Sequence, residues 1–263
     1  MVKNSSRMPK RRRLEIVSRI QEKKIVTVKQ LAEIFDTSYL TIRRDLENLE
    51  KEGIVKKVHG GAILVKELEL EPIIDINKEI AKEEKNRIAL EASKRIQNNM
   101  DIIIGTGSTC LLVVKYLNDK KNIKVATASM SIAMELWKLA VNKKDMEISV
   151  CGGLFKPGSG DFIGPHSINF FYDININLAF IGAISLNINN GLITTTYFDA
   201  EITRAIVRCS KETIVLVDSS KFGIHAHINV LPLNKISEII TDTGLDDDTV
   251  QKIRSIGVKV TLV

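Results

Sequence analysis

The sequence has few of the features that mark secreted and membrane proteins. Its three cysteines, Cys110, Cys151 and Cys209, lie far apart with no Cys-x-x-Cys pair, which argues against a disulfide framework and favours buried thiols in a reduced compartment. No apolar run reaches the roughly 18 residues of a membrane-spanning helix. The basic N-terminus lacks the apolar core and the small-residue cleavage site of a secretory signal. We therefore expect a cytoplasmic protein.

Signals for common cofactors and metals are also missing. The sequence contains no Walker motif, and the dinucleotide fingerprint fails because Cys110 stands where a third glycine is required. The strand that follows ends in the neutral residues 127–129 instead of an acidic residue. His225 and His227 could place two imidazoles on one strand face, but no cysteine or carboxylate cluster adjoins them. We expect neither a cofactor nor a metal.

The positive charge is confined to one end of the chain. The formal net charge is +6 over 263 residues. Residues 1–60 hold fifteen Lys and Arg against eight Asp and Glu, whereas the remaining residues hold 23 against 24. Such asymmetry points to a nucleic-acid or membrane contact made by the first sixty residues. A solvated basic tail would account for residues 10–13 but not for the pattern that follows them.

Three helix patterns and a hairpin follow in this basic segment. Apolar residues recur at helical spacing after Pro9, after Thr27 and after Ser38. Thr27 and Ser38 are suited to cap the second and third helices, and Gln30 completes a capping box with Thr27. Gly53 suits the end of the third helix, and the run IVKKV-HGG-AILV predicts a hairpin. We expect the inward faces of the second and third helices to be formed by Leu31, Ala32, Ile34, Phe35, Leu40, Ile42, Leu46 and Leu49.

This arrangement predicts a winged helix-turn-helix. The second helix of such a motif enters the major groove of DNA and reads bases with its N-terminal residues. Arginine suits guanine edges, and lysine suits phosphates. The alternative is a small helical interaction domain with solvated charges. The candidate DNA-contacting residues are Ser38, Tyr39, Thr41, Arg43 and Arg44 on the helix, with Lys56, Lys57 and His59 in the wing.

From about residue 78 the pattern changes to apolar strands that alternate with amphipathic helices. The runs DIIIGTG and IKVATAS are strand patterns, and each is followed by a helix pattern. Such alternation predicts a Rossmann-like α/β fold with a largely parallel sheet. We therefore expect a winged helix-turn-helix domain over 1–65, a linker over 66–77 and an α/β effector-sensing domain over 78–263.

A phosphate-type loop follows the first strand of this second domain. Ligands of α/β folds bind at the carboxyl ends of the strands. There the run IIIGTGSTC offers glycines, whose amides approach an anion closely, and hydroxyls at a helix N-terminus. The alternative is a tight structural turn. The candidate effector-binding residues are Gly105, Thr106, Gly107, Ser108, Thr109, Thr127, Ser129, Gly152, Gly153 and Lys221.

Both halves of the chain resemble one family. The run VTVKQLAEIFDTSYLTIRRDLENLEKEGIVKKVHGGA is similar to the DNA-binding domain of DeoR-family bacterial transcriptional regulators, with Lys57 where the family usually has Arg. The runs GTGST and DSSKFG resemble the family's effector domain, although most members have Asp where Gly105 stands. The resemblance implies a repressor of sugar-metabolism genes, with a double-stranded DNA operator and a phosphorylated sugar as its partners. A single winged domain reads one half-site, so we expect a homodimer or a dimer of dimers.

The effector domain of this family is itself similar to ribose-5-phosphate isomerase, which raises the alternative of a sugar-phosphate isomerase-like enzyme with an appended DNA-binding domain. That enzyme carries acidic residues after a Gly-Ala, whereas Gly182 and Ala183 are followed here by Ile-Ser-Leu-Asn. Without a positioned carboxylate base, sugar enolisation has no proton acceptor. A further alternative, a nucleic-acid binder with an inert oligomerisation domain, leaves the phosphate-type loop without a role. We therefore expect a sensor and not an enzyme.

Overall fold

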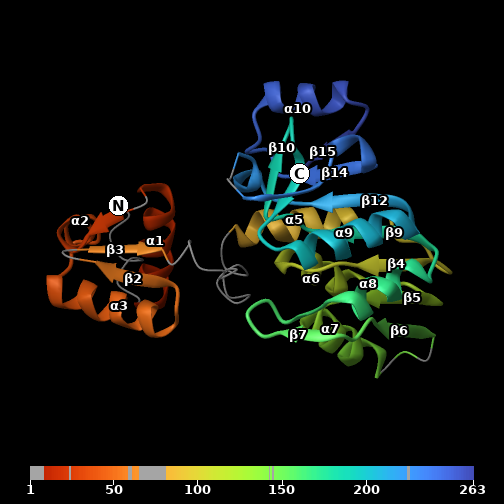
Figure 1. The fold of residues 1–263 in the computed structure, drawn as a ribbon, viewed down its shortest axis with the longest axis horizontal. Coiled ribbons are helices and arrows are strands. Elements are labelled where there is room, and N and C mark those ends of the chain that lie inside the picture. Colours follow the sequence, from red (N-terminus) through yellow and green to blue (C-terminus); the bar gives the residue numbers. More distant parts are fainter. Residues whose placement is uncertain are drawn as a thin grey trace. The chain divides into compact units, whose positions relative to one another are not determined.

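A computed structural model describes residues 9–23, 25–58, 61–64, 81–141, 143, 145–223 and 226–263. Contacts divide the chain into two units, Met1–Ile76 and Asn77–Val263 (Figure 1). The expected linker over 66–77, His59 and His225 lie outside the described residues, as do the side chains of Lys56 and Lys57. None of the helices in the described part of the chain is long and apolar enough to cross a membrane.

The N-terminal unit packs three helices against a small antiparallel sheet. Its helices are α1 (Pro9–Lys23), α2 (Val28–Ile34) and α3 (Tyr39–Lys51). Its strands are β1 (Ile25–Thr27), β2 (Val55–Val58) and β3 (Gly61–Leu64), in the order β1-β3-β2. β2 and β3 form the expected hairpin, and β1 extends it by one strand. Helices α2 and α3, joined by a short turn, form the expected helix-turn-helix.

Local sequence sets the ends of these helices. The Thr27 hydroxyl accepts a hydrogen bond from the Gln30 amide at 3.2 Å, and the Gln30 side chain accepts one from the Thr27 amide at 2.9 Å, which confirms the capping box. Ser38 caps α3 by accepting from the Thr41 amide at 3.1 Å. Gly53 follows the end of α3 with a φ of +72°, the left-handed conformation that glycine adopts at low cost.

One apolar core joins the three helices and the sheet. Its centre is formed by Ile16, Ile20, Leu31, Ile42, Leu46 and Val55. Two residues expected on the inward faces do not belong to it, because Ile34 is 40% exposed and Leu40 is 60% exposed. The prediction was wrong for both. Helical spacing predicts which apolar residues share one face of a helix. It does not predict which of them a neighbouring helix will bury.

A buried ion pair ties α1 to α3. Arg12 Nε donates to Asp45 Oδ2 at 2.5 Å, and both side chains are less than one-tenth exposed. Arg12 lies in the basic run at 10–13, yet it belongs to the core of the unit and not to a solvated tail. Asp45 follows the two arginines of the third helix, and its carboxylate neutralises a guanidinium that would otherwise be buried without a partner.

The C-terminal unit is built on a seven-stranded sheet in the order β15-β14-β12-β9-β4-β5-β6. Every neighbouring pair in this sheet is parallel. This confirms the expected Rossmann-like α/β fold. The strands are β4 (Asp101–Ile104), β5 (Ile123–Thr127), β6 (Met146–Val150), β9 (Ile176–Ile181), β12 (Ser210–Leu216), β14 (Glu238–Thr241) and β15 (Lys259–Leu262).

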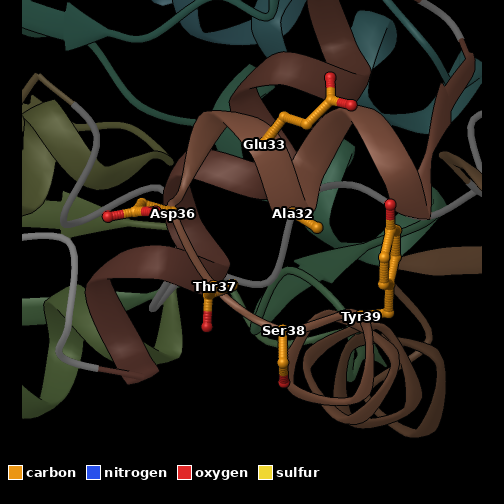
Figure 2. A pocket seen from close by; sticks show the side chains of 6 residues that line it. All are labelled: Ala32, Glu33, Asp36, Thr37, Ser38 and Tyr39. Atoms are coloured by element: carbon orange, nitrogen blue, oxygen red, sulfur yellow. The ribbon is translucent and has the colours of Figure 1, made fainter.

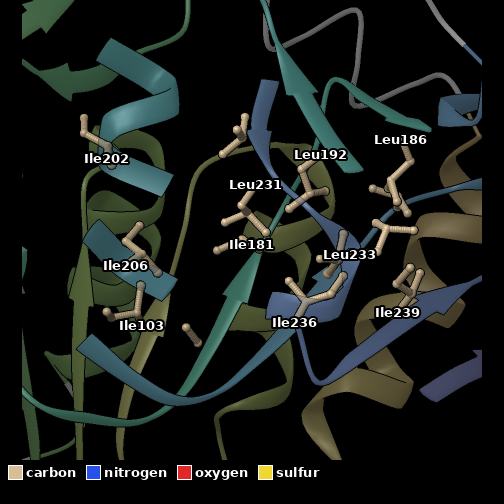
Figure 3. Packing of buried hydrophobic residues seen from close by; sticks show 14 of the residues in the cluster. Ile103, Ile181, Leu186, Leu192, Ile202, Ile206, Leu231, Leu233, Ile236 and Ile239 are labelled. Atoms are coloured by element: carbon tan, nitrogen blue, oxygen red, sulfur yellow. The ribbon is translucent and has the colours of Figure 1, made fainter. Parts of the chain in front are cut away.

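Helices cover both faces of the sheet. α5 (Lys82–Ser93), α6 (Ser108–Val113) and α7 (Met130–Ala140) share a core with Ile102 and Ile104 of β4. α8 (Pro165–Tyr172), α9 (Tyr197–Cys209) and α10 (Asp247–Ser255) pack on the opposite face, where Figure 3 shows Ile103 near Ile206 of α9. Successive strand residues point to opposite faces, and both faces are buried, so the strands read as continuous apolar runs.

Smaller elements complete this unit. β10 (Ser185–Asn187), β11 (Gly191–Thr194) and β13 (Ile228–Leu231) form one antiparallel sheet, and β7 (Leu154–Lys156) pairs with β8 (Asp161–Ile163) in another. The 3-10 turn η1 (Val114–Tyr116) continues α6, so this helical segment ends in a tighter turn. Two further 3-10 turns are η2 (Ser219–Lys221), after β12, and η3 (Leu233–Lys235).

The strand order creates a switch point beside β4. From β4 the chain passes to β5 and β6, and it later returns to β9, which pairs with the opposite side of β4. All seven strands are parallel, so their carboxyl ends lie at one edge of the sheet. Ligands of open α/β sheets bind at that edge, next to the switch point. The loop after β4 therefore occupies the expected position for a ligand site.

The prediction of buried thiols is also confirmed in this unit. All three cysteines are buried free thiols. Burial raises the pKa of Cys110 to about 12 and that of Cys151 to about 11, so both stay protonated at neutral pH. Asp246 accepts a hydrogen bond from the Thr249 amide at 2.9 Å and caps α10, which explains the acidic run there.

Replacing Asp45 by Ala should destabilise the N-terminal unit by roughly 3–5 kcal/mol, because Arg12 would stay buried without its partner. Urea unfolding of the full chain, followed by circular dichroism, measures this loss. Glu52→Ala is the matched control: it removes the exposed carboxylate that pairs with Arg13 at 3.0 Å. The control should cost less than about 1 kcal/mol. Equal small losses for both variants would contradict a structural role for the buried pair.

Candidate functional site

The outward face of α3 carries the residues predicted to read DNA bases. Tyr39 is 53% exposed, and Arg43 and Arg44 are exposed one turn further along. Leu40 precedes the two arginines by three and four residues and so lies on the same face. This is the feature that sequence reasoning missed, because Leu40 was assigned to the core. An exposed apolar side chain beside arginines suits contact with a thymine methyl group.

Ser38 and Thr41 shape the first turn of α3. The Ser38 hydroxyl accepts from the Thr41 amide and lies 2.9 Å from the Thr41 hydroxyl. Ser38 is exposed and Thr41 is half-buried. Both were predicted as DNA contacts, and the structure gives both a capping role. The pair fixes the turn from which Tyr39 and the arginines project.

A shallow hollow of about 350 Å³ opens where α2 turns into α3 (Figure 2). The chain reverses there at Asp36, whose φ is +46°. Carboxylates of Glu33 and Asp36 line the hollow together with Ala32, Thr37, Ser38 and Tyr39. Two carboxylates repel the phosphates of DNA. The surface suited to DNA is therefore the arginine side of α3 and not this hollow.

At its basic positions the wing is described only through its backbone. Lys56 and Lys57 lie in β2, where they pair with Ile63 and Ala62 of β3. Their side chains and all of His59 lie outside the described residues. Their contact with DNA remains a prediction.

The glycine loop follows β4 at the switch point. The Gly105 amide donates to the Phe180 carbonyl of β9 at 2.8 Å. A β-carbon on Gly105 would lie 2.9 Å from that oxygen, so the close approach of β9 requires glycine. The sheet already uses this donor, so the amides left to approach an anion are those that follow Gly105.

The accessible part of the loop begins after Gly105. Gly107 precedes α6 with a φ of +110°, and a β-carbon there would meet no atom within 4 Å. Position 107 therefore requires glycine because of its backbone conformation and not because neighbouring atoms crowd it. The first amides of α6 have no acceptor within the helix. Thr106 and Ser108 are half-buried, Gly107 is exposed and Thr109 is buried, so residues 106–108 form the reachable surface.

The candidate residues at the end of β5 are buried. Thr127 is fully buried, and its hydroxyl accepts from the Ser129 amide at 3.1 Å. Ser129 is 3% exposed and forms a backbone bridge with Asp161 of β8. Asp161 is a buried carboxylate that sequence reasoning did not single out. Burial, and then the nearby Asp161, raises the pKa of Cys110, which places this carboxylate near the start of α6.

Gly152 and Gly153 follow β6 and pack against α8. The Ser167 hydroxyl donates to the Gly152 carbonyl at 2.6 Å. A β-carbon on Gly153 would lie 2.2 Å from Ser167 Oγ, and the φ of Gly153 is +111°. The close approach of α8 is therefore a structural reason for these glycines that does not depend on a ligand.

Lys221 has a neighbour that the sequence did not reveal. Lys85 lies in the first turn of α5, is 2% exposed, and its ammonium is 3.9 Å from the Asp218 carboxylate. Burial lowers the pKa of Lys85 to about 8, with Asp218 opposing the shift and Lys221 adding to it. Lys221 belongs to the turn that begins at Asp218, since its amide donates to the Asp218 carbonyl at 3.0 Å, and Asp218 is the carboxylate beside Lys85. α5 packs against α6, so this cationic cluster and the loop both lie at the carboxyl edge.

Asp242 holds η2, the turn that carries the Lys221 ammonium. The amide and hydroxyl of Ser219 donate to its carboxylate at 2.6 and 2.8 Å, and the Gly244 amide donates at 2.9 Å. Burial acts to raise the pKa of Asp242, but these hydrogen bonds prevail and lower it below its ordinary value. Hydrogen bonds to an ionised carboxylate are strong. The turn after β12 is therefore anchored firmly to β14.

Comparison with known proteins identifies the two units separately. A family model described as the DeoR-like helix-turn-helix domain matches residues 12–67, and one described as the DeoR C terminal sensor domain matches residues 80–243. The chain belongs to the DeoR family. It is a DNA-binding transcriptional regulator with a C-terminal sensor domain, which confirms the family resemblance of both halves.

Relatives of this DeoR-family protein span nearly its whole length. An uncharacterized HTH-type transcriptional regulator of Bacillus subtilis is 32% identical over 96% of this chain and 96% of its own. The glycerol-3-phosphate regulon repressor of Escherichia coli is 28% identical over 86% of this chain and 88% of its own. Among solved structures, a D-ribose-5-phosphate isomerase matches 54% of this chain and 54% of its own, with 23% identity and a TM-score of 0.39.

Replacing Gly105 by Ala should destabilise the sensor unit by roughly 1–3 kcal/mol, because the added methyl group meets the backbone of β9. Gly158→Ala is the control, since a β-carbon there would meet no atom within 4 Å. Thermal unfolding of the full chain compares the two variants. A control that loses as much stability as Gly105→Ala would show that crowding against β9 is not the cause.

Proposed function

We propose that this DeoR-family regulator represses sugar-metabolism genes and that its sensor domain binds a phosphorylated sugar that alters operator affinity. The observation that carries the proposal is the pair of amines, Lys85 and Lys221, at the ligand edge of the sensor domain. A buried amine whose pKa is lowered gains from an incoming dianion, which stabilises its charged form. The name of the glycerol-3-phosphate regulon repressor supports a phosphorylated polyol or sugar as effector.

In this proposal the phosphate binds between the loop after β4 and the cationic cluster. The amides at the start of α6 and the Ser108 hydroxyl donate to its oxygens, and the ammonium groups of Lys221 and Lys85 neutralise its charge. Asp161 provides a carboxylate that can accept hydrogen bonds from sugar hydroxyls. That role replaces the contact for which most family members have Asp at position 105.

We propose that the site binds its ligand without converting it. Gly182 and Ala183 follow β9, and a β-carbon on Gly182 would lie 3.0 Å from the Thr106 carbonyl. Neutral residues follow them, where the isomerase carries acids. Asp218 is engaged by Lys85 and by the Ser220 hydroxyl.

The DNA-binding part of the proposal places α3 in the major groove. Tyr39, Leu40, Arg43 and Arg44 face the bases, and the wing contacts the sugar-phosphate backbone. One unit covers one half-site, so two copies bind an operator with two half-sites about one helical turn apart. The effector changes operator affinity only through unequal binding to the free and the DNA-bound conformations. A coupling of roughly 1–3 kcal/mol is usual for such regulators.

Replacing Arg43 or Arg44 by Ala should reduce the preference for operator over random DNA by roughly 1–3 kcal/mol per lost base contact. Fluorescence anisotropy with both DNAs, at one fixed salt concentration, gives the ratio. Lys51→Ala is the control because Lys51 is exposed at the far end of the same helix. The control should leave the ratio unchanged. If both arginine variants also keep the parental ratio, α3 is not the reading helix.

Effector binding should weaken as the pH rises through about 8, because Lys85 then loses the positive charge that attracts the phosphate. Isothermal titration with glycerol 3-phosphate and a panel of sugar phosphates at pH 7 and pH 9 measures the change. A phosphate monoester is fully charged across this range, since its second pKa is about 6. The Lys85→Met variant should bind the effector more weakly at pH 7, and its affinity should change less between pH 7 and pH 9.

Lys221→Ala should also lose the response of operator binding to the effector. Lys235→Ala is its matched control, because Lys235 is exposed and likewise ends a 3-10 turn. Operator titrations with and without effector compare the two variants. A parental response in Lys221→Ala, or loss of the response in Lys235→Ala, would place the pocket elsewhere.

A further inference from the structure

Helix α7 has an apolar stripe that faces solvent. Met130 is 40% exposed, Met134 46%, Trp137 57% and Val141, the residue after the helix, 66%. The spacing of four, three and four residues places all four side chains on one face. Apolar side chains with this spacing form the contact when one helix packs along another.

The same helix already buries its opposite side. Ile132 and Leu136 are fully buried against the sheet. A helix at a protein surface normally turns charged and polar residues outward. The charged residues of α7 are Glu135 and Lys138, and they form an ion pair with each other at 2.6 Å. α7 is therefore apolar on two sides and electrically neutral.

The stripe is nearly symmetric about its own centre. The midpoint between Met134 and Trp137 coincides with the midpoint between Met130 and Val141. When two copies of the helix lie antiparallel, Met134 of each faces Trp137 of the other, and Met130 faces Val141. A two-fold interface needs such self-complementarity, because the same patch must meet itself.

Further apolar side chains adjoin the stripe. α7 packs beside β6 and β8, and β6 is an edge strand of the seven-stranded sheet. Leu154 and Phe155 of β7 are 63% and 49% exposed, and Val150 at the end of β6 is 39% exposed. Figure 1 shows α7, β6 and β7 together at the same end of the unit.

We propose that this surface, formed by α7 with β6 and β7, pairs with the same surface of a second copy of the chain through an antiparallel contact between the two α7 helices. Glu135 and Lys138 lie on one flank of the stripe, and in an antiparallel pair that flank meets its own copy. The carboxylate of each copy then faces the ammonium of the other. A strongly charged partner would find no complementary charge on this helix.

The size of the surface fits this pairing. An eleven-residue helix is about 16 Å long, and one face of a helix this short covers less than the roughly 800 Å² that each partner of a stable dimer buries. The exposed residues of β6 and β7 extend the contact beyond the helix. The inference deepens the two-copy requirement of the proposed function by assigning it to a surface of the sensor unit.

Sedimentation velocity and intrinsic fluorescence of the full chain test the proposal together, because Trp137 is the one tryptophan in the sequence. The parent should be at least dimeric, and dilution should shift its emission to longer wavelength as Trp137 becomes solvated. Met134→Glu and Trp137→Glu should raise the dissociation constant at least about 30-fold, as loss of a central interface residue does. Leu90→Glu is the matched control, since Leu90 is 46% exposed on α5, and it should associate like the parent.

Cysteine cross-linking tests the orientation. The double variant Met130→Cys with Val141→Cys keeps the central Met134 and Trp137 and should form a covalent dimer under mild oxidation. Met130→Cys alone should not, because position 130 meets position 141 of the other copy. The native thiols are buried and do not interfere. A parent that stays monomeric at micromolar concentration overturns both the surface and the two-copy requirement. A dimer that survives both glutamate substitutions overturns the surface alone and leaves the proposed function standing.

Discussion

The hydrogen bond from the Gly105 amide to the Phe180 carbonyl fixes where the sensor unit can bind a ligand. It holds the loop after β4 against β9 at the point where the strand order reverses. The β-carbon of any other residue would press on the backbone of β9. Because this first glycine is committed to the sheet, the residues that follow it, 106–108, are left at the carboxyl edge. The candidate effector site, its lysines and its buried carboxylates are all arranged around that edge.

Each unit contains a buried ion pair, and the two pairs differ in geometry. Arg12 and Asp45 are in direct hydrogen-bond contact, so the charges satisfy each other and hold two helices together. Lys85 and Asp218 are 3.9 Å apart, and Lys221 adds a second positive charge nearby. Removing charges from water is costly unless they are well paired. The Lys85 pair lies beside the turn that carries Lys221, at the edge where the effector is proposed to bind.

The two units have separate hydrophobic cores in the described part of the chain. Pairing of two sensor units through α7 would fix one copy relative to the other. A ligand that moves the loop after β4 also acts on α6, and α6 contacts α7. The proposed effector site and the proposed pairing surface are thus joined by packed helices, which is a physical route for the effector to alter the spacing of two DNA-binding units.

The sequence by itself determined the features that depend on local chemistry. Helix caps at Thr27 and Ser38, the hairpin, the alternation of strands and helices and the family of the chain were all readable, because each is encoded within a few dozen consecutive residues. Only the tertiary structure decided the features that join distant residues. Leu40 proved exposed, Arg12 proved buried against Asp45, and the amide of Gly105 proved to be used by β9. Lys85 reached Asp218 across more than a hundred residues. Burial depends on which elements pack together, and neither hydrophobic periodicity nor motif spacing contains that information.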